Sequence, residues 1–293
     1  ELSLHLFSVL TMGAGIIFCL NGSMTLSEAL MTVVISFLVF SQIQSTGSAV
    51  SLLRVVGSSI DHADQIDEIP EMDSTGRPVS PKKHDISFDH VDFSYDKRPI
   101  LKDVSITIPD CTTTAIIGPS GSGKTTLCSL IARFWDVDHG SICIGGTDIR
   151  EYTLESLMDQ ISMVFQNVYL FADTIENNIK FGKPDASHEQ VVAAAKKTCC
   201  HDFISALPDG YDTVIGEGGA TLSGGEKQRI SIARAMLKNA PIIIFDEATA
   251  NVDPENEDKL QKAMEELMRD KTILMIAHRL KTVQKADRIL VLD

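Results

Sequence analysis

The 293-residue chain carries 40 acidic and 26 basic residues, which gives a formal net charge of −14 at pH 7. That balance argues against a nucleic-acid surface, which needs clustered Lys and Arg, so we expect no nucleic acid as a partner. It does not exclude nucleotide binding, since one local pocket suffices for that. The six cysteines form no C-x-x-C pair and no zinc-ligand spacing, so we expect buried, reduced thiols.

The N-terminal part predicts two membrane-spanning helices joined by a tight turn. Leu2–Leu20 contains no Asp, Glu, Lys or Arg, and a helix needs ~20 such residues to cross a bilayer core. A second uncharged run covers Ala29–Leu53, and its polar second half is expected to face other helices or a water-filled path. The turn Asn21–Ser27 lacks Lys and Arg whereas Arg54 follows the second run, so the turn is predicted outside and the later residues in the cytoplasm. A pair of buried core helices in a soluble protein is the alternative.

Apolar residues keep roughly helical spacing after Arg54, so the second helix is expected to continue and to end near Pro70. Residues 70–83 include three prolines and a glycine, which is typical of a linker. Residues 84–293 alternate short β-type runs with helices, which predicts an α/β domain with a largely parallel sheet. Residues 1–69 would then contain two spans and a cytoplasmic helix extension.

Five apolar runs in the α/β domain have the length and composition of strands. They cover residues 86–95, 104–108, 114–118, 242–249 and 272–278. A helix is expected over Thr126–Trp135.

The segment GPSGSGKTT, residues 118–126, fits the pattern G-x-x-x-x-G-K-[ST] of a P-loop. It follows a predicted strand and opens a predicted helix, which is the context that this motif requires. Backbone N–H groups of a glycine-rich loop curl around phosphates, and the helix N-terminus adds partial positive charge. We expect Lys124 to reach the β- and γ-phosphates and Thr125 to ligate Mg²⁺. The remaining contact residues of the loop would be Gly118, Pro119, Ser120, Gly121, Ser122, Gly123 and Thr126.

The run IIIFDEAT ends in two consecutive carboxylates, Asp246 and Glu247. Carboxylates at the end of a buried strand cost desolvation energy unless they are used. Beside a P-loop, Asp246 would hold the shell of Mg²⁺, and Glu247 would polarise the attacking water as general base. His278 ends the run TILMIAH at a strand tip that could meet the γ-phosphate, although a lone histidine is usually structural.

The P-loop, LSGGEKQR, FDEAT and AHR, in that order, resemble the nucleotide-binding domain of ABC transporters over residues 84–293. The resemblance implies an α/β P-loop NTPase fold with a helical subdomain, preceded here by an all-α transmembrane hairpin. It also implies ATP and Mg²⁺ as ligands, and ATP hydrolysis. Ser223, Gly224 and Gly225 match the signature loop, which would cap the γ-phosphate held by the P-loop of a second half-transporter. Whether that partner is identical or different stays open.

Further roles follow from the same resemblance. Tyr95 matches the aromatic residue that stacks on adenine, and Gln166 the glutamine that contacts Mg²⁺ and water and senses the membrane helices. Asp253 matches the D-loop aspartate, although the preceding residues, Ala250-Asn251-Val252, differ from the small hydrophobic residues that are usual there. His278 matches the switch histidine. Glu217 would lie in a loop that touches intracellular helices.

Membrane helices that precede the ATPase in one polypeptide resemble exporter-type half-transporters. By that likeness, Leu2–Leu20 and Thr25–Gln44 are the last two of six spans. The sequence is then expected to be a fragment at both ends, with four spans missing before it and the domain truncated at its C-terminus. The implied location is the plasma (inner) membrane of a bacterium, multi-pass, with a cytoplasmic ATPase domain. Lipid and a transported solute are the further expected partners.

There are three alternatives to this interpretation. A soluble ABC ATPase of DNA repair or translation would lack the apolar N-terminal runs. A binding or regulatory module with an inactive ATPase site would lack some of Lys124, Asp246, Glu247 and His278. Within transporters, a siderophore-handling importer with an exporter fold is the alternative, and the sequence specifies neither the solute nor the direction of transport.

Overall fold

The computed structural model describes residues 2–67, 75–96, 98–219, 222–246, 254–277 and 283–293. The chain divides into two compact units, Glu1–Met72 and Asp73–Asp293. The assignment of residues 1–69, 70–83 and 84–293 to three functional segments stays a prediction.

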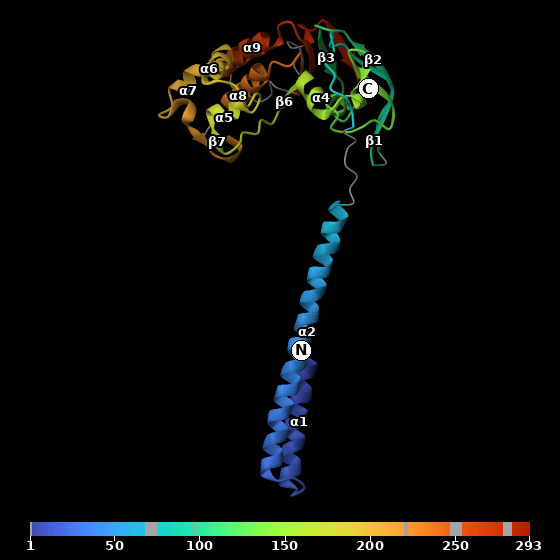
Figure 1. Ribbon diagram of the computed structural model, residues 1–293, viewed down its shortest axis with the longest axis vertical. Coiled ribbons are helices and arrows are strands. Elements are labelled where there is room, and N and C mark those ends of the chain that lie inside the picture. The colour runs from blue at the N-terminus through green and yellow to red at the C-terminus, as the bar shows by residue number, and fades with distance from the viewer. Residues whose placement is uncertain (1, 68–74, 97, 220–221, 247–253, 278–282) are drawn as a thin grey trace. The chain divides into compact units, whose positions relative to one another are not determined.

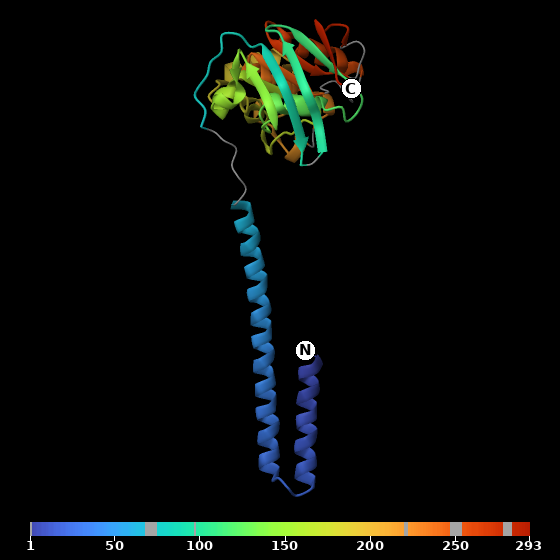
Figure 2. The same cartoon turned by 90° about the vertical axis from the view of Figure 1, so that its right-hand side faces the viewer.

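The N-terminal unit is a hairpin of two helices, α1 (Leu2–Leu20) and α2 (Leu26–Asp67), which pack side by side (Figures 1 and 2). One hydrogen bond, 2.6 Å long, joins the hydroxyls of Thr11 and Ser36 across the pair. The prediction that the second helix continues past Arg54 is confirmed, because α2 is unbroken to Asp67. Among the described residues, α2 alone is long and apolar enough to cross a membrane, and the apolar stretch described in α1 is shorter, Val9–Leu20.

The hydroxyl groups in the polar half of α2 bond to the backbone of their own helix. Ser45 and Thr46 both donate to the carbonyl of Gln42 at 2.9 Å, and Ser51 donates to Gly47 at 3.1 Å. Such back-bonding satisfies a hydroxyl locally. The polar half of α2 therefore carries fewer unmet hydrogen-bonding groups than its sequence suggests.

The second unit contains an antiparallel sheet that Figure 2 shows in front of the unit. Its strand order is β2-β1-β4-β5. The strands are β1 (Ile86–Tyr95), β2 (Arg98–Ile108), β4 (His139–Ile144) and β5 (Thr147–Asp148). The strand predicted at 104–108 is longer than expected, because the largely exposed residues from Arg98 onward also pair with β1.

A five-stranded parallel sheet forms the centre of the unit, with the order β11-β3-β10-β9-β6. The strands are β3 (Thr113–Ile117), β6 (Ile161–Val164), β9 (Ile242–Asp246), β10 (Thr272–Ile276) and β11 (Arg288–Val291). The predicted parallel sheet is confirmed.

Both faces of the parallel sheet are buried, as is usual for parallel sheets. Ile242 and Ile244 of β9 point into a core shared with the antiparallel sheet and with α3 (Lys124–Ile131). Ile243 and Phe245 point into a second core, which α8 (Gly224–Lys238) and α9 (Pro254–Met268) cover. The continuous apolar run of β9 is therefore explained by burial on two sides.

A layer of short helices forms the predicted helical subdomain. Its elements are β7 (Asp173–Thr174), α5 (Ile175–Lys180), α6 (His188–Lys197), α7 (His201–Ser205), η2 (Gly210–Asp212) and β8 (Val214–Ile215). A third core joins these elements to α8 through Ile230 and Ala233. In Figure 1, α5, α6, α7 and β7 lie at the end of the unit away from β1 and β2. The remaining short elements are η1 (Ile149–Glu151), α4 (Leu154–Gln160) and η3 (Glu217–Gly219).

The expectation of buried cysteines holds for two of the six. Cys128 and Cys200 are buried, and burial raises the pKa of Cys200 to about 12. The prediction is wrong for Cys111, which is exposed in the turn between β2 and β3. All six thiols are free.

Candidate functional site

Parallel strands bring most of the predicted site residues to one edge of the sheet. Ile276 of β10 pairs with Ile116 of β3 on one side and with Asp246 of β9 on the other. The P-loop begins at Gly118, just beyond β3, and Gln166 follows β6, the strand beyond β9. Ligands of open α/β sheets bind outside the carboxyl ends of the strands. The strand order therefore groups the P-loop, Asp246 and Gln166 within a few strand spacings of ~4.8 Å each.

The P-loop has the backbone that its glycines permit. Gly121 and Gly123 have φ angles of +84° and +92°, in the region that favours glycine. A Cβ on Gly123 would lie 2.9 Å from the Cδ2 atom of Leu101, so no larger residue fits there without a shift of that side chain. Helix α3 begins at Lys124, two residues before the predicted start, and ends at Ile131, four residues before the predicted end at Trp135.

Donor groups of the P-loop fit an anion. The ammonium of Lys124 is buried and donates to the carbonyls of Gly118 and Pro119, at 3.0 and 2.7 Å. The hydroxyl of Ser122 is buried with no hydrogen-bond partner in the structure. Gly123 caps α3 without any side-chain acceptor for the first N–H groups of the helix. Orphaned donors at a helix N-terminus are the features that bind phosphate in other proteins.

Asp246 lies near the first turns of α3. Burial, followed by the charge of Asp246, raises the pKa of the Cys128 thiol, one turn after Lys124. The hydroxyl of Thr125, the amide of Gln166 and the carboxylate of Asp246 are oxygen donors, the kind that Mg²⁺ prefers. In the described part of the chain no three His, Cys, Asp or Glu residues cluster as metal ligands. A mixed oxygen site with substrate phosphates is the arrangement that these residues fit.

The signature segment starts a helix, as its sequence pattern suggests. Ser223 is the N-cap of α8 and forms a capping box with Glu226, whose carboxylate accepts from the N–H and the hydroxyl of Ser223, both at 2.8 Å. Because the box occupies the N–H groups of Ser223 and Glu226, those of Gly224 and Gly225 keep no intrahelical partner. Leu222 packs on the core of the helical layer, whereas α3 belongs to the core under the antiparallel sheet. The chain thus holds its two phosphate-binding candidates in different layers.

Tyr95 is the last residue of β1 and is about one-third exposed, at 36%. Its ring makes edge contacts with Phe93 and Trp135, at centroid distances of 4.9 and 5.4 Å. The sequence did not single out Trp135. The only feature of the sequence that could have indicated Trp135 is that it is an aromatic residue soon after the P-loop helix.

The structure describes some of the other predicted site residues and not others. Pro119, Ser120 and Gly121 are exposed on the P-loop, Thr125 is exposed on the first turn of α3, and Thr126 is buried. Glu247, Asp253 and His278 lie outside the described residues, as does the side chain of Glu217. Their roles stay predictions.

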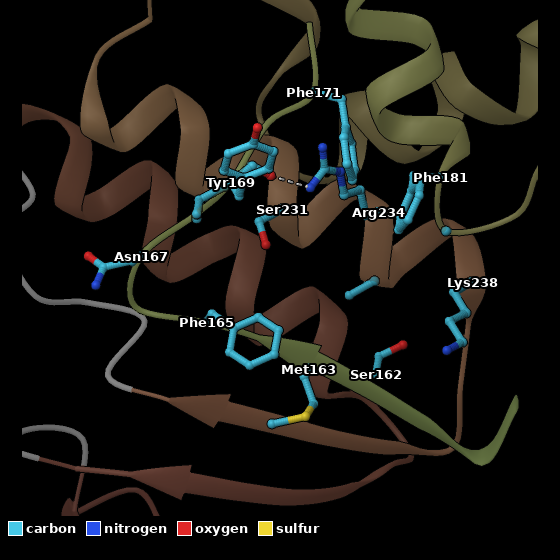
Figure 3. A pocket seen from close by; sticks show the side chains of 13 residues that line it. Ser162, Met163, Phe165, Asn167, Tyr169, Phe171, Phe181, Ser231, Arg234 and Lys238 are labelled. Atoms are coloured by element: carbon cyan, nitrogen blue, oxygen red, sulfur yellow. Dashed lines mark hydrogen bonds between the residues drawn. The ribbon is translucent and has the colours of Figure 1, made fainter. Parts of the chain in front are cut away.

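A pocket of about 300 Å³ lies between the segment after β6 and helix α8 (Figure 3). Four of its thirteen lining residues are aromatic, and these four are 42–65% exposed: Phe165, Tyr169, Phe171 and Phe181. Gln166 is the next residue after Phe165, and the amide of Gln228 on α8 donates to the Phe165 carbonyl at 3.3 Å. The pocket therefore adjoins the segment that carries the predicted Mg²⁺-contacting glutamine. Sequence reasoning missed it.

Arg234 of α8 contacts several of the segments that form this pocket. Its guanidinium donates to the carbonyls of Tyr169 and Asn178, at 2.8 and 2.6 Å, and to the Asn178 side-chain oxygen at 2.5 Å. The guanidinium also lies within 5.7 and 5.8 Å of the ring centroids of Phe171 and Phe181, as Figure 3 shows. Burial lowers the pKa of Arg234 to about 10, which leaves it charged at pH 7. One side chain thus joins α8, α5 and the segment after Gln166.

We expect the substitution Arg234→Ala to lower the free energy of unfolding by about 3 kcal/mol, because hydrogen bonds to charged groups contribute about 1.5–3 kcal/mol each and two carbonyls lose their donor. For a domain of this size that corresponds to a fall in Tm of about 6–12 °C. Thermal unfolding of the chain in detergent, followed by circular dichroism, measures it. Arg269→Ala is the matched control, since Arg269 is 74% exposed and pairs with Glu266 at the surface. Equal melting of the two variants would contradict the assignment.

Comparisons with known proteins agree on one family. The family model described as "ABC transporter" matches residues 101–250. The chain is 48% identical over 252 residues to a protein named ATP-dependent lipid A-core flippase from Desulfotalea psychrophila, covering 86% of this chain and 43% of that protein. It is 50% identical over 210 residues to YgaD of Bacillus subtilis, named a putative multidrug export ATP-binding/permease protein, covering 71% of this chain and 36% of that one.

A solved structure of a bacterial Atm1-family ABC exporter with ATP bound has a TM-score of 0.75 to the chain and 39% sequence identity. The match covers 89% of this chain and 47% of that one. The chain spans less than half the length of these relatives. On the family match and on the grouping of P-loop, Asp246 and Gln166 at one sheet edge, the chain belongs to the ABC transporter family, and its second unit is an ABC ATPase domain.

Proposed function

We propose that the chain is the ATP-binding and ATP-hydrolysing part of an exporter-type half-transporter, which couples ATP-driven dimer closure to movement of a solute across a membrane. The observation that carries the proposal is the P-loop. Its buried ammonium and its unpartnered Ser122 hydroxyl lie at the carboxyl edge of a parallel sheet, next to Asp246. These donors suit the triphosphate of a nucleotide.

Each predicted site residue has its own role in ATP binding or hydrolysis. Lys124 exchanges its two carbonyl partners for β- and γ-phosphate oxygens and offsets their charge. Tyr95 stacks on adenine. Glu247 accepts a proton from the attacking water, and His278 and Gln166 orient the water against the γ-phosphate. Thr125, Gln166 and Asp246 would hold Mg²⁺, which neutralises charge on the phosphates when bound.

Hydrolysis requires a second chain. Gly224 and Gly225 start a helix in a different layer from the P-loop, and their N–H groups, which have no partner within that helix, suit a nucleotide held by another copy or by a related half-transporter. Asp253 would lie at the same dimer interface. The two chains would then complete two sites together. Identical and different partners are both compatible with this scheme.

The exposed aromatic pocket beside Gln166 supports a link to the membrane domain. Large exposed apolar surfaces on a soluble domain mark interaction sites. We propose that cytoplasmic helices of the complete transporter contact this pocket and the loop of Glu217. The complete protein would be a multi-pass protein of the plasma (inner) membrane of a bacterium, in contact with lipid. Relatives named for lipid flipping and multidrug export favour an amphipathic solute and export over the siderophore-importer alternative.

Nucleotide titration of the detergent-solubilised chain tests the proposal. Calorimetry with ATP and EDTA is expected to show one site per chain. Phosphate release with MgATP is expected to rise more steeply than linearly with chain concentration, because a complete site needs two chains. Absence of ATP binding would contradict the site, and a rate per chain that does not depend on concentration would contradict the shared site. A chain that stays in solution without detergent would favour the soluble ABC ATPase alternative.

A further inference from the structure

Three aromatic rings meet where β1 ends. Phe93 is buried, and its ring lies 4.9 Å from that of Tyr95 at an interplanar angle of 86°. Trp135 lies 5.4 Å from the same tyrosine ring at 85°. Edge-to-face contacts at such distances are favourable for aromatic pairs. The Tyr95 ring is therefore held by two neighbours, one in the core and one outside it.

Trp135 is itself fixed in place. It lies between Arg133 and Asp136, whose side chains form an ion pair with Nε–Oδ1 and Nη2–Oδ2 distances of 2.8 and 3.3 Å. The Arg133 side chain is only 2% exposed, so the pair anchors the turn to the core. The N–H of Phe134 also donates to the carbonyl of Ser129 at 3.0 Å. A tryptophan that is half exposed is thus attached to a turn that an ion pair and a backbone hydrogen bond hold in place.

The same ribbon reaches the P-loop. Phe93 pairs with Leu101 across β1 and β2, and the side chains of Leu101 and Ile100 fill the space that a Cβ on Gly123 would need at the start of α3. Tyr95 lies two residues further along β1, about 7 Å away at the rise of a strand. Tyr95 therefore ends the same pair of strands, β1 and β2, that carries Leu101 beside the start of α3.

We propose that Trp135 is a positioning residue for the nucleotide base: its edge-to-face contact with the Tyr95 ring fixes the orientation in which that ring receives adenine, without Trp135 touching the nucleotide itself. This inference rests on the proposed function, because it uses Tyr95 as the residue that stacks on the base. Trp135 should then affect binding of nucleotides that have a base, through Tyr95 alone. It should not affect the phosphate loop.

Calorimetry on the detergent-solubilised chain tests this with two ligands, ATP with EDTA and inorganic tripolyphosphate. The variants are Trp135→Ala, Trp135→Phe, Tyr95→Ala and the double variant, with Phe134→Ala, the adjacent exposed aromatic residue, as matched control. Because aromatic pairs contribute about 0.5–1.5 kcal/mol, Trp135→Ala should weaken ATP binding roughly two- to tenfold. Trp135→Phe should restore most of the loss. Tripolyphosphate should bind all variants equally.

The double variant decides the mechanism. If Trp135 acts through Tyr95, Trp135→Ala adds no loss in the Tyr95→Ala background. An equal loss in both backgrounds means direct contact with the nucleotide and overturns the inference, as does unchanged ATP affinity in Trp135→Ala. Weaker tripolyphosphate binding would show damage to the loop and also overturns it. Failure of the unsubstituted chain to bind ATP would instead sink the proposed function, so the two failures are distinguishable.

Trp135 is the single tryptophan of the chain, which supplies an independent readout. ATP binding is expected to change its fluorescence emission, since the base would stack on its direct neighbour. The change should vanish in Tyr95→Ala at ATP concentrations that saturate the site. A response that persists in Tyr95→Ala would speak for contact between base and tryptophan, against the inference.

Discussion

Replacement of Lys124 by alanine is expected to lower MgATP hydrolysis by roughly 100- to 1000-fold, the loss typical of removing one preorganised charge from a transition state. The ammonium is buried and its present partners are two carbonyls of the loop itself. No other Lys or Arg lies within residues 118–126, so nothing in the loop can replace its charge. Phosphate release at saturating MgATP and high chain concentration measures the effect.

Lys102→Ala is the matched control for Lys124→Ala. Lys102 is exposed on β2 and follows Leu101, which lies beside Gly123, so the same charge is lost near the loop without loss of a phosphate contact. Circular dichroism should show both variants folded. If Lys124→Ala hydrolyses MgATP at a rate within a few-fold of that of the unsubstituted chain, the role assigned to Lys124 is wrong.

Replacement of Glu247 by glutamine is expected to lower hydrolysis about 100- to 10,000-fold, the contribution typical of a general base, while ATP binding is retained. The reason lies in the neighbouring residue. Asp246 ends β9 level with Ile276 and close to α3, and we expect the next carboxylate in the chain to act at the edge where the phosphates would lie. The amide keeps the shape of the side chain but does not accept the proton of water.

The Glu247→Gln variant should therefore accumulate as an ATP-bound dimer, because closure needs ATP and reopening needs hydrolysis. Light scattering after gel filtration with MgATP measures its mass. Glu155→Gln, an exposed change of the same type on α4, should remain active and show no ATP-dependent dimer. A Glu247→Gln chain that hydrolyses ATP at the normal rate would assign the base to another residue.

Short motifs in the sequence predict the candidate site residues, whose roles stay predictions. The P-loop, Asp246 and Ser223 each belong to a local pattern, and the parallel strands that precede the P-loop and carry Asp246 are continuous apolar runs. Helix α3 ended earlier than predicted because Arg133 adopts a φ of +52°, and arginine is not a residue that marks a helix end in sequence.

Contacts between distant parts of the chain were not predictable in this way. Arg234 and Asn178 are 56 residues apart, and their bond depends on how the helical layer packs on α8. The meeting of Tyr95 with Trp135 depends likewise on the antiparallel sheet covering α3. The spacing of these residues in the sequence does not indicate either contact, because tertiary packing alone brings the two members of each pair together.

Helix α2 has 42 residues in one unbroken run. At 1.5 Å per residue it is about 63 Å long, roughly twice the ~30 Å of a bilayer's hydrocarbon core. A membrane of ordinary thickness would cover only half of such a helix. Because backbone hydrogen bonds run continuously through it, the other half cannot turn or tilt independently. The helix would behave as a lever whose two arms, one in lipid and one in water, move together.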